Sequence, residues 1–214
     1  MPVVEISDKT LDEGARLLRA GQLVAFPTET VYGLGADATN GAAVAAIYAA
    51  KGRPQFNPLI AHVADTDAAK RHVELKGKAL KLAQAFWPGP LTLVLPGGHG
   101  RVPLQLRGPE GGIAVRWTSH PAIQRLIRAH GDPITSTSAN RPGVPPAMTS
   151  REIVAQWPDA IARGDLRVLD GGMLTPSDPS TVVDCMGRHP RVIRPGAIPA
   201  HVLRESVPSL IGDA

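Results

Sequence analysis

The sequence predicts an α/β fold, in which helices pack against a twisted mixed sheet. Apolar runs typical of strands alternate with helical spacings of apolar residues along all 214 residues. Strand-like runs are denser in the second half, which favours a mixed sheet over a purely parallel one. No repeat, low-complexity tract or linker interrupts the chain. We therefore expect a single domain over 1–214, with its core at about 8–198 and a short C-terminal tail at 199–214.

The first half is expected to begin with a helix that ends at Gly21, followed by a strand that runs into a polar, glycine-bearing turn. Asn40 can cap the next helix, which is rich in Ala, and Pro88 and Pro90 break a later one. The predicted elements are a helix over 8–20, a strand over 22–26, a helix over 41–50, a strand over 58–63, helices near 66–74 and 78–87, and a strand over 91–96.

The second half opens with a long loop, because 97–112 is rich in Gly and Pro. Ser119 is expected to cap a helix that Gly131 ends, and Thr149 with Glu152 forms a capping-box pattern that opens a short helix. The predicted strands are 113–117, 133–137, 166–169, 181–185 and 191–194, and a short helix and a loose tail close the chain.

Composition limits the possible functions. The formal net charge of +4 suits an anionic ligand such as a nucleotide, or weak RNA contact, and identifies neither. Cys185 is the sole cysteine, which excludes an internal disulfide and a Cys-rich zinc site. The N-terminus is not typical of a signal or transit peptide, and no apolar run approaches the roughly 20 residues that cross a bilayer. We expect a soluble, cytoplasmic protein without a membrane segment.

Familiar catalytic and nucleotide-binding motifs are missing from the sequence. It contains no G-x-x-x-x-G-K-[ST], no H-E-x-x-H and no G-x-S-x-G. Residues 33–38 match a relaxed dinucleotide fingerprint, but the preceding strand ends too early and no acidic residue follows at the expected distance. The sequence therefore does not favour a dinucleotide-binding fold.

Two cations, Lys51 and Arg53, stand side by side where the Ala-rich helix is expected to end. Lys in the last turn, Gly52 and then Pro54 make an ordinary helix stop. The alternative is that both cations reach one anion, since a mobile ammonium and a rigid guanidinium combine well around a polyphosphate. Spacing alone favours the helix stop over the anion site.

Hydroxyl and amide side chains gather at 135–140, after an apolar strand. They form either a strand end with an Asx-turn or part of a ligand site at the carboxyl end of a strand. Arg116 and Arg194 lie in or at the end of strands, where an inward-pointing guanidinium needs an anion. His62 is more typical of a structural histidine when it is considered alone.

Together these stretches resemble the YrdC-like family of threonylcarbamoyl-AMP synthases, over about 8–198. The motifs that carry the resemblance are PTETVYGLG (27–35), KGRPQFNPLIAH (51–62), WPGPLTLVL (87–95), AVR (114–116), TSTSAN (135–140), PSTVVD (179–184) and IRPG (193–196).

The resemblance implies a mixed α/β sheet with a concave, basic cavity. It implies a nucleotidyltransferase that makes L-threonylcarbamoyladenylate and pyrophosphate from ATP, L-threonine and bicarbonate, with Mg²⁺ carried on the phosphates. The product would serve the t6A modification of tRNA position 37 through a separate threonylcarbamoyl transferase.

The resemblance also implies residue roles. The nucleotide-side positions are Lys51, Arg53, Asn57, Ser138, Asn140 and Arg194, of which Lys51 and Arg53 are the catalytic pair. The threonine-side positions are Thr30, His62, Arg116, Ser136 and Ser180. No dedicated metal ligands are implied.

The sequence departs from the family pattern after Asn140, where residues 142–146 replace the usual Ser-Gly and later hydroxyl. It resembles the short form of the family, because the longer form adds a linker and a second domain. Two alternatives remain open: an enzyme that forms a carbamoyl adenylate from carbamoyl phosphate, and an RNA-binding or ribosome-assembly factor without catalytic activity.

Overall fold

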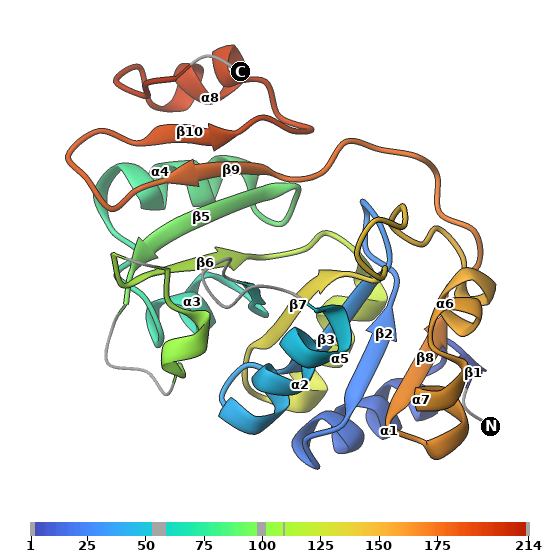
Figure 1. Ribbon diagram of the computed structural model, residues 1–214. Coiled ribbons are helices and arrows are strands. Elements are labelled where there is room, and N and C mark those ends of the chain that lie inside the picture. Colours follow the sequence, from blue (N-terminus) through green and yellow to red (C-terminus); the bar gives the residue numbers. More distant parts are fainter. Residues whose placement is uncertain (1–2, 53–58, 98–101, 109, 213–214) are drawn as a thin grey trace.

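The computed structural model describes residues 3–52, 59–97, 102–108 and 110–212, whose strands form a mixed ten-stranded sheet. The strand order is β1-β8-β2-β3-β7-β4-β6-β5-β9-β10, with parallel and antiparallel neighbours. Figure 1 shows this sheet running from β1 and β8 at one end to β10 at the other. The strands are β1 (Val3–Glu5), β2 (Leu23–Phe26), β3 (Gly33–Asp37), β4 (Ile60–His62), β5 (Leu91–Pro96), β6 (Gly112–Arg116), β7 (Ile134–Ser138), β8 (Leu166–Asp170), β9 (Thr181–Asp184) and β10 (Arg191–Arg194).

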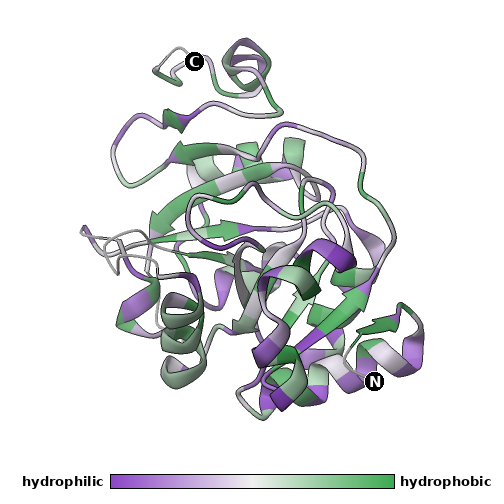
Figure 2. Cartoon of the chain, turned by 45° about the vertical axis from the view of Figure 1, so that its right-hand side comes forward, coloured by the Kyte–Doolittle hydropathy of each residue, from purple (hydrophilic) through white to green (hydrophobic). Residues whose placement is uncertain are grey.

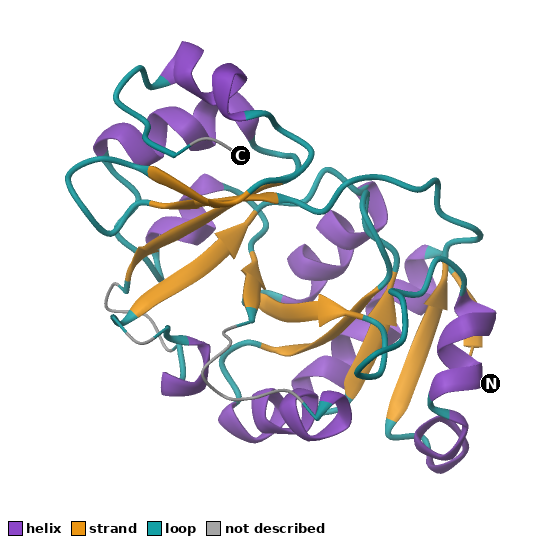
Figure 3. Ribbon diagram, turned by 45° about the horizontal axis from the view of Figure 1, so that its top comes forward, coloured by secondary structure: helices purple, strands orange, loops and turns teal. Residues whose placement is uncertain are grey.

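Helices flank the sheet, as Figure 3 shows, and the predicted fold class is confirmed. Among the described residues, no helix has the length and apolar character needed to cross a membrane. The helices are α1 (Asp8–Arg19), α2 (Gly41–Lys51), α3 (Thr66–Lys70), α4 (Gly77–Phe86), the 3-10 turn η1 (Leu104–Leu106), α5 (Pro121–His130), α6 (Ser150–Gln156), α7 (Pro158–Arg163) and α8 (Ala200–Ser206).

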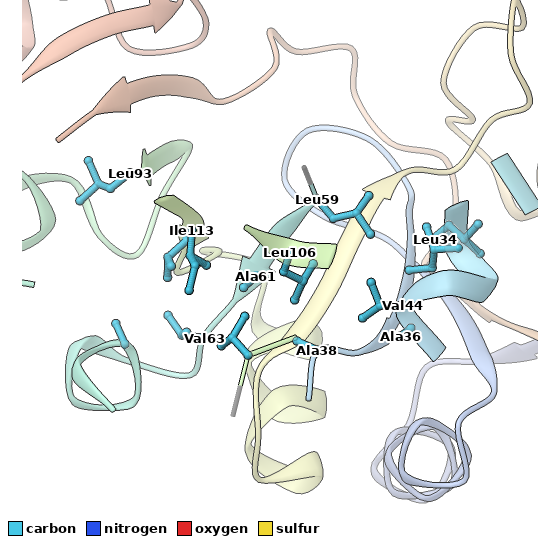
Figure 4. Packing of buried hydrophobic residues seen from close by; sticks show 14 of the residues in the cluster. Leu34, Ala36, Ala38, Val44, Leu59, Ala61, Val63, Leu93, Leu106 and Ile113 are labelled. Carbon is cyan, nitrogen blue, oxygen red and sulfur yellow. The ribbon is translucent and has the colours of Figure 1, made fainter. Parts of the chain in front are cut away.

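Strand alternation divides the core between the two faces of the sheet. Val24 and Phe26 of β2 pack in one cluster with α1 and α5, whereas Ala25, one residue away, packs in a second cluster that includes α2. Figure 4 shows the second cluster, in which Val44 of α2 lies near Leu34 of β3. Figure 2 shows that hydrophobic residues dominate the strands while hydrophilic residues occur along the helices. The sheet thus lies between the two clusters, and each cluster packs on one of its faces.

Most predicted elements are found with boundaries shifted by one to three residues. The Asn40 side chain caps α2 by accepting from the backbone N–H groups of Ala42 and Ala43, at 3.0 and 3.2 Å. Gly52 ends the same helix in the left-handed conformation, with φ of 56°. The capping box of Thr149 and Glu152 is also present. Local capping rules therefore predicted these helix ends correctly.

The prediction was wrong between 27 and 39, where the glycine-bearing turn contains strand β3. Glycine disfavours strands in general, but the aromatic ring of Phe26 fills the space above Gly33 and Gly35 and replaces their missing side chains. Strand β1 and helix α7 were not predicted, and the long loop over 97–112 contains η1. The N-cap position of α5 is His120, not Ser119, and its side chain makes no capping hydrogen bond. Residue 58 of the strand expected at 58–63 lies outside the described residues.

The contact between Phe26 and Gly35 gives a test of this strand. A Cβ atom at Gly35 would overlap the ring of Phe26 and lie 3.2 Å from Cγ2 of Ile134. We expect Gly35→Ala to lower the free energy of unfolding by about 1–3 kcal/mol, because the packed core cannot yield freely. Gly187→Ala is the matched control, since nothing lies within 4 Å of its added Cβ atom. Urea denaturation of both variants measures the difference, and equal stabilities would contradict the packing described here.

Candidate active site

A cavity of about 710 Å³ lies over one face of the central strands. Its volume falls in the range of small-molecule binding sites. Strands β3, β7, β4, β6, β5 and β9 contribute to its floor. The polar or charged side chains that line it are Thr28, Thr30, His62, Thr92, Arg116, Ser136, Thr137, Ser138, Ser177, Ser180 and Arg194.

Small residues in register explain why this face is hollow. Gly33 of β3 pairs with Ser138 of β7, and Ile60 of β4 pairs with Ser136 on one side and Ala114 on the other. All five line the cavity. Paired residues point to the same face of a sheet, so the small residues Gly33, Ser138, Ser136 and Ala114 leave a space around Ile60 that larger residues would fill.

The loop after β2 brings two threonines to the cavity. The Thr28 hydroxyl donates to the backbone carbonyl of Val31 at 2.7 Å and accepts from the N–H groups of Thr30 and Val31, both at 3.2 Å. The hydroxyls of Thr28 and Thr30 lie 3.0 Å apart. This local network fixes the loop, and it keeps the buried Thr30 side chain at the cavity wall.

Arg116, at the end of β6, is 4 % exposed and forms an ion pair with Glu29. Arg116 Nη2 lies 2.8 Å from Glu29 Oε1, and the Nε–H of Arg116 donates to the backbone carbonyl of Gly89 at 3.3 Å. Glu29 Oε1 also accepts from the backbone N–H of Ser119 at 3.1 Å, and Oε2 accepts from the hydroxyl of Thr118. Glu29 thus holds the guanidinium from behind, because Arg116 lines the cavity and Glu29 does not.

The surroundings of Glu29 keep its carboxyl ionised. Burial by itself raises the pKa of Glu29, but the charge of Arg116 and the hydrogen bonds from Thr118, Arg116 and Ser119 outweigh it and lower the pKa to about 2. At neutral pH the Glu29 and Arg116 charges therefore compensate each other.

His62, at the end of β4, is 2 % exposed and lines the cavity. It pairs with Arg116 across the parallel strands β4 and β6, and its ring meets the ring of Phe26 edge to face at 6.5 Å. Burial and the charge of Arg116 lower the pKa of His62 to about 3, against a smaller opposite effect of Glu29. The imidazole is therefore neutral over the physiological range.

Ser180 and Arg194, which both line the cavity, contact each other. The Ser180 hydroxyl lies 2.8 Å from that of Thr92, and Arg194 Nη2 donates to the Ser180 carbonyl and hydroxyl oxygens at 2.7 and 3.0 Å. The backbone of Gly196 packs against the backbone of Pro179 so closely that an added Cβ atom would overlap it. This close contact seats the loop that carries Ser180.

Lys51 is the last residue of α2, and its side chain reaches the turn that follows β7. Its ammonium donates to the Ser138 carbonyl at 2.7 Å, the Asn140 carbonyl at 2.6 Å and the Asn140 side-chain oxygen at 2.8 Å. The Ser138 hydroxyl donates to the same Asn140 oxygen at 2.6 Å, and the Asn140 amide donates to the Val144 carbonyl at 2.6 Å. Lys51 thus organises the Ser138–Asn140 turn. Of the predicted helix stop, Lys51 and Gly52 end α2 as expected, and Pro54 lies outside the described residues.

Known proteins resemble this chain in sequence over most of its length. A family model described as "Telomere recombination", that of the Sua5, YciO and YrdC proteins, matches residues 16–196. The chain belongs to the Sua5/YciO/YrdC family. In the wider comparison, it is 41% identical over 210 residues to the threonylcarbamoyl-AMP synthase of Bacillus subtilis, covering 96% of this chain and 58% of that protein. It is 40% identical over 182 residues to the synthase of the same name from Methylococcus capsulatus, covering 85% of this chain and 95% of that protein.

Solved structures of Sua5/YciO/YrdC proteins share the fold. Pyrococcus abyssi Sua5 complexed with L-threonine matches with a TM-score of 0.89 and 34% identity, covering 99% of this chain and 63% of that one. YciO from Escherichia coli matches with a TM-score of 0.80 and 25% identity, covering 91% of this chain and 94% of that one. The chain spans somewhat more than half the length of the B. subtilis and P. abyssi synthases.

The structure brings most of the predicted site residues together. All five residues predicted for the threonine side line the cavity, as do Ser138 and Arg194 of the nucleotide side. Lys51 and Asn140 stand behind Ser138 and are not part of the lining, and Arg53 and Asn57 lie outside the described residues. The binding roles of all these residues, and the basic character of the cavity, stay predictions.

Sequence reasoning missed Glu29, Thr118 and Thr92. Glu29 stood within the stretch 27–35 that was singled out, and a carboxylate among hydroxyls was a signal that a cation lies nearby. Thr118 and Thr92 gave no such signal, because their partners Glu29 and Ser180 are distant in the sequence. Among the described residues, no group of three or more His, Cys, Asp or Glu side chains is placed to hold a metal ion.

The Glu29 ion pair predicts an acid-dependent stability. The folded-state pKa of Glu29 is about 2 against an ordinary value of 4.5, so its stabilisation is present above pH 4.5 and is lost as the pH falls towards 2. We expect Glu29→Gln to lower the free energy of unfolding by about 2–3 kcal/mol at pH 7, with the difference from wild type shrinking below pH 4.5. Denaturant unfolding at several pH values measures this.

The matched control is Asp67→Asn, which removes a carboxylate from an exposed ion pair with Lys70. An exposed pair contributes about 0–1 kcal/mol, so this variant should stay close to wild type. A Glu29→Gln difference that does not change with pH would contradict the ion pair as the cause.

Proposed function

We propose that the protein is an L-threonylcarbamoyladenylate synthase. It forms threonylcarbamoyl-AMP and pyrophosphate from L-threonine, bicarbonate and ATP, and so supplies the t6A modification of tRNA position 37. The names of the relatives and the L-threonine complex of P. abyssi Sua5 support this proposal. The observation that carries it in this chain is the buried guanidinium of Arg116, which Glu29 holds at a cavity wall among the hydroxyls of Thr30, Ser136 and Ser180.

This wall suits a small hydroxy amino acid. A buried guanidinium binds a carboxylate strongly, because both groups are charged and the guanidinium donates in a fixed, fork-like geometry. The neighbouring hydroxyls of Thr30, Ser136 and Ser180 can each donate to or accept from a substrate hydroxyl or amine. In this arrangement Arg116 takes the carboxylate of threonine, and the amine is left for reaction.

The nucleotide is proposed to bind towards the Ser138–Asn140 turn. Ser138 lines the cavity beside this turn, and Lys51 holds the turn in shape and adds a positive charge behind it. Arg194 lines the cavity next to Ser180. Arg53, Asn57 and Asn140 complete the nucleotide side in this proposal, with Lys51 and Arg53 as the cations that act on the phosphates. Mg²⁺ would arrive bound to the phosphates of ATP, because such sites use few protein ligands.

The proposed reaction has two steps. The amine of threonine takes up bicarbonate to give a carbamate, and a carbamate oxygen then attacks the α-phosphate of ATP, from which pyrophosphate leaves. Phosphoryl and nucleotidyl transfers of this kind depend on alignment and on neutralising charge, more than on a covalent protein nucleophile. The product is then used by a separate threonylcarbamoyl transferase, and weak contact with tRNA remains part of the proposal.

Mass spectrometry of a reaction with ATP, Mg²⁺, bicarbonate and L-threonine tests the proposed activity. We expect a labile threonylcarbamoyl adenylate and an equal amount of pyrophosphate, both lost when any one component is left out. Product from carbamoyl phosphate in place of threonine and bicarbonate would favour the carbamoyl-adenylate alternative. Tight RNA binding without ATP turnover would favour the non-catalytic alternative.

Arg116→Lys tests the carboxylate contact. Lysine keeps the charge but loses the fork-like geometry, and a charge-assisted hydrogen bond is worth about 1.5–3 kcal/mol. We therefore expect the KM for L-threonine to rise about 10- to 150-fold, and the KM for ATP to change little. Arg125→Lys is the control, because Arg125 of α5 forms a surface ion pair with Asp12. Equal effects on both KM values would contradict a specific contact with the amino acid.

A further inference from the structure

Threonine reaches the proposed site with its amine protonated, because α-amino groups carry a proton at neutral pH. An ammonium has no lone pair, so it cannot attack bicarbonate or CO₂ until a base removes a proton. In the proposed reaction a group of this chain must therefore take that proton.

The lining of the cavity restricts the choice. Its described side chains are hydroxyl, apolar or cationic, with no Asp, Glu, Lys, Cys or Tyr among them. Arginine does not give up its proton in proteins, so Arg116 and Arg194 cannot act as bases. Among the described residues that line the cavity, His62 is therefore the one side chain whose neutral form offers a nitrogen lone pair to a proton. In the empty site burial and the charge of Arg116 hold its pKa at about 3, so the proton transfer depends on how bound substrate changes these surroundings.

Glu29, just behind the wall, is not a substitute. Its two carboxylate oxygens are occupied by Arg116, Ser119 and Thr118, and the same contacts lower its pKa to about 2. These contacts engage both carboxylate oxygens, and Glu29 is not among the residues that line the cavity.

The state of His62 fits the role. It is 2 % exposed, and within the described part of the chain its Nδ1 atom is buried and has no hydrogen-bond partner. Leaving a buried polar atom unsatisfied costs free energy. Both ring nitrogens of His72 are unpaired in the same way among the described residues, so what distinguishes His62 is its place in the cavity lining beside Arg116. Phe26 restrains the ring edge to face, and the register of β4 and β6 sets it beside Arg116.

We propose that His62 is the catalytic base that accepts a proton from the bound amino acid's ammonium. This inference rests on the proposed function. An N–H bond of the ammonium breaks, its electron pair stays on nitrogen, and the proton moves to a ring nitrogen of His62, which becomes imidazolium. The amine then forms the C–N bond with bicarbonate, giving carbamate and water, and the imidazolium returns its proton to solvent.

The charges around His62 favour this transfer once substrate is bound. In the described structure Arg116 and Glu29 are the charged groups that act on His62, and His120, also titratable, lies near Glu29. In the empty site burial is the largest cause of the low pKa of His62, and Arg116 lowers this pKa more than Glu29 raises it. A carboxylate bound at Arg116 adds a negative charge that offsets the effect of the guanidinium and stabilises an imidazolium.

The test compares His62→Gln with wild type in single-turnover reactions from pH 6.5 to 9. Glutamine keeps a hydrogen-bonding group but cannot act as a base. We expect formation of threonylcarbamoyl-AMP to be about 100-fold or more slower at pH 7, because general bases contribute 10²–10⁴-fold. The deficit should shrink as the pH rises from 7 and level off above about pH 8, because the share of amine that solvent has deprotonated stops growing above the ordinary pKa of an α-amino group.

His72→Gln is the matched control. His72 is another buried histidine whose pKa burial lowers, but it does not line the cavity. Its rate should follow that of wild type at every pH. A His62→Gln deficit that stays constant with pH would overturn the proposal, since it would indicate that His62 only holds the substrate. No product from wild type under any condition would instead contradict the proposed function.

A second measurement does not depend on the variant. In wild type with ¹⁵N-labelled histidine, the NMR titration midpoint of His62 should rise when L-threonine is added. L-threoninol, which has no carboxylate, should leave it in place. An unchanged midpoint with L-threonine would overturn the charge argument and with it the proposal.

Discussion

The ion pair between Arg116 and Glu29 is the constraint on which the rest of the site depends. It joins the end of β6 to the loop after β2, and the hydroxyl of Thr118 and the backbone of Ser119 complete it. Because both charges are compensated, a guanidinium can be almost fully buried at a cavity wall without an uncompensated charge. The charges of the same pair act on His62, so in the proposed mechanism the carboxylate contact and the proton transfer depend on one ion pair.

The cavity itself results from the sheet. Most proteins fill the face of a sheet with helices, and α1 and α5 do so at one end of this face. Beyond them the register aligns Gly33, Ser138, Ser136 and Ala114, whose small size leaves the floor open. The polar groups that line it come from the ends of different strands. Arg116 and Ser180 are each held by hydrogen bonds of their own.

Sequence reasoning reached the fold class, the helix caps and the residues that gather in the cavity, because those depend on local patterns and on a recognisable set of motifs. It failed at β3, where the glycines are tolerated only because the ring of Phe26 covers them, and this is a tertiary effect. It also missed Glu29, whose importance comes from Arg116, 87 positions later in the numbering. Pairings over such distances leave no periodic signal in a single sequence.

The pairing of His62 with Arg116 has a consequence for how the protein can change. Strand neighbours are about 4.8 Å apart whatever the length of the connections between them. The chain between the two residues contains α3, α4 and β5, and insertions into its surface loops would leave the spacing of the imidazole and the guanidinium untouched. The sheet thus fixes the spacing of these two side chains. The surface loops between them can vary in length and composition without changing it.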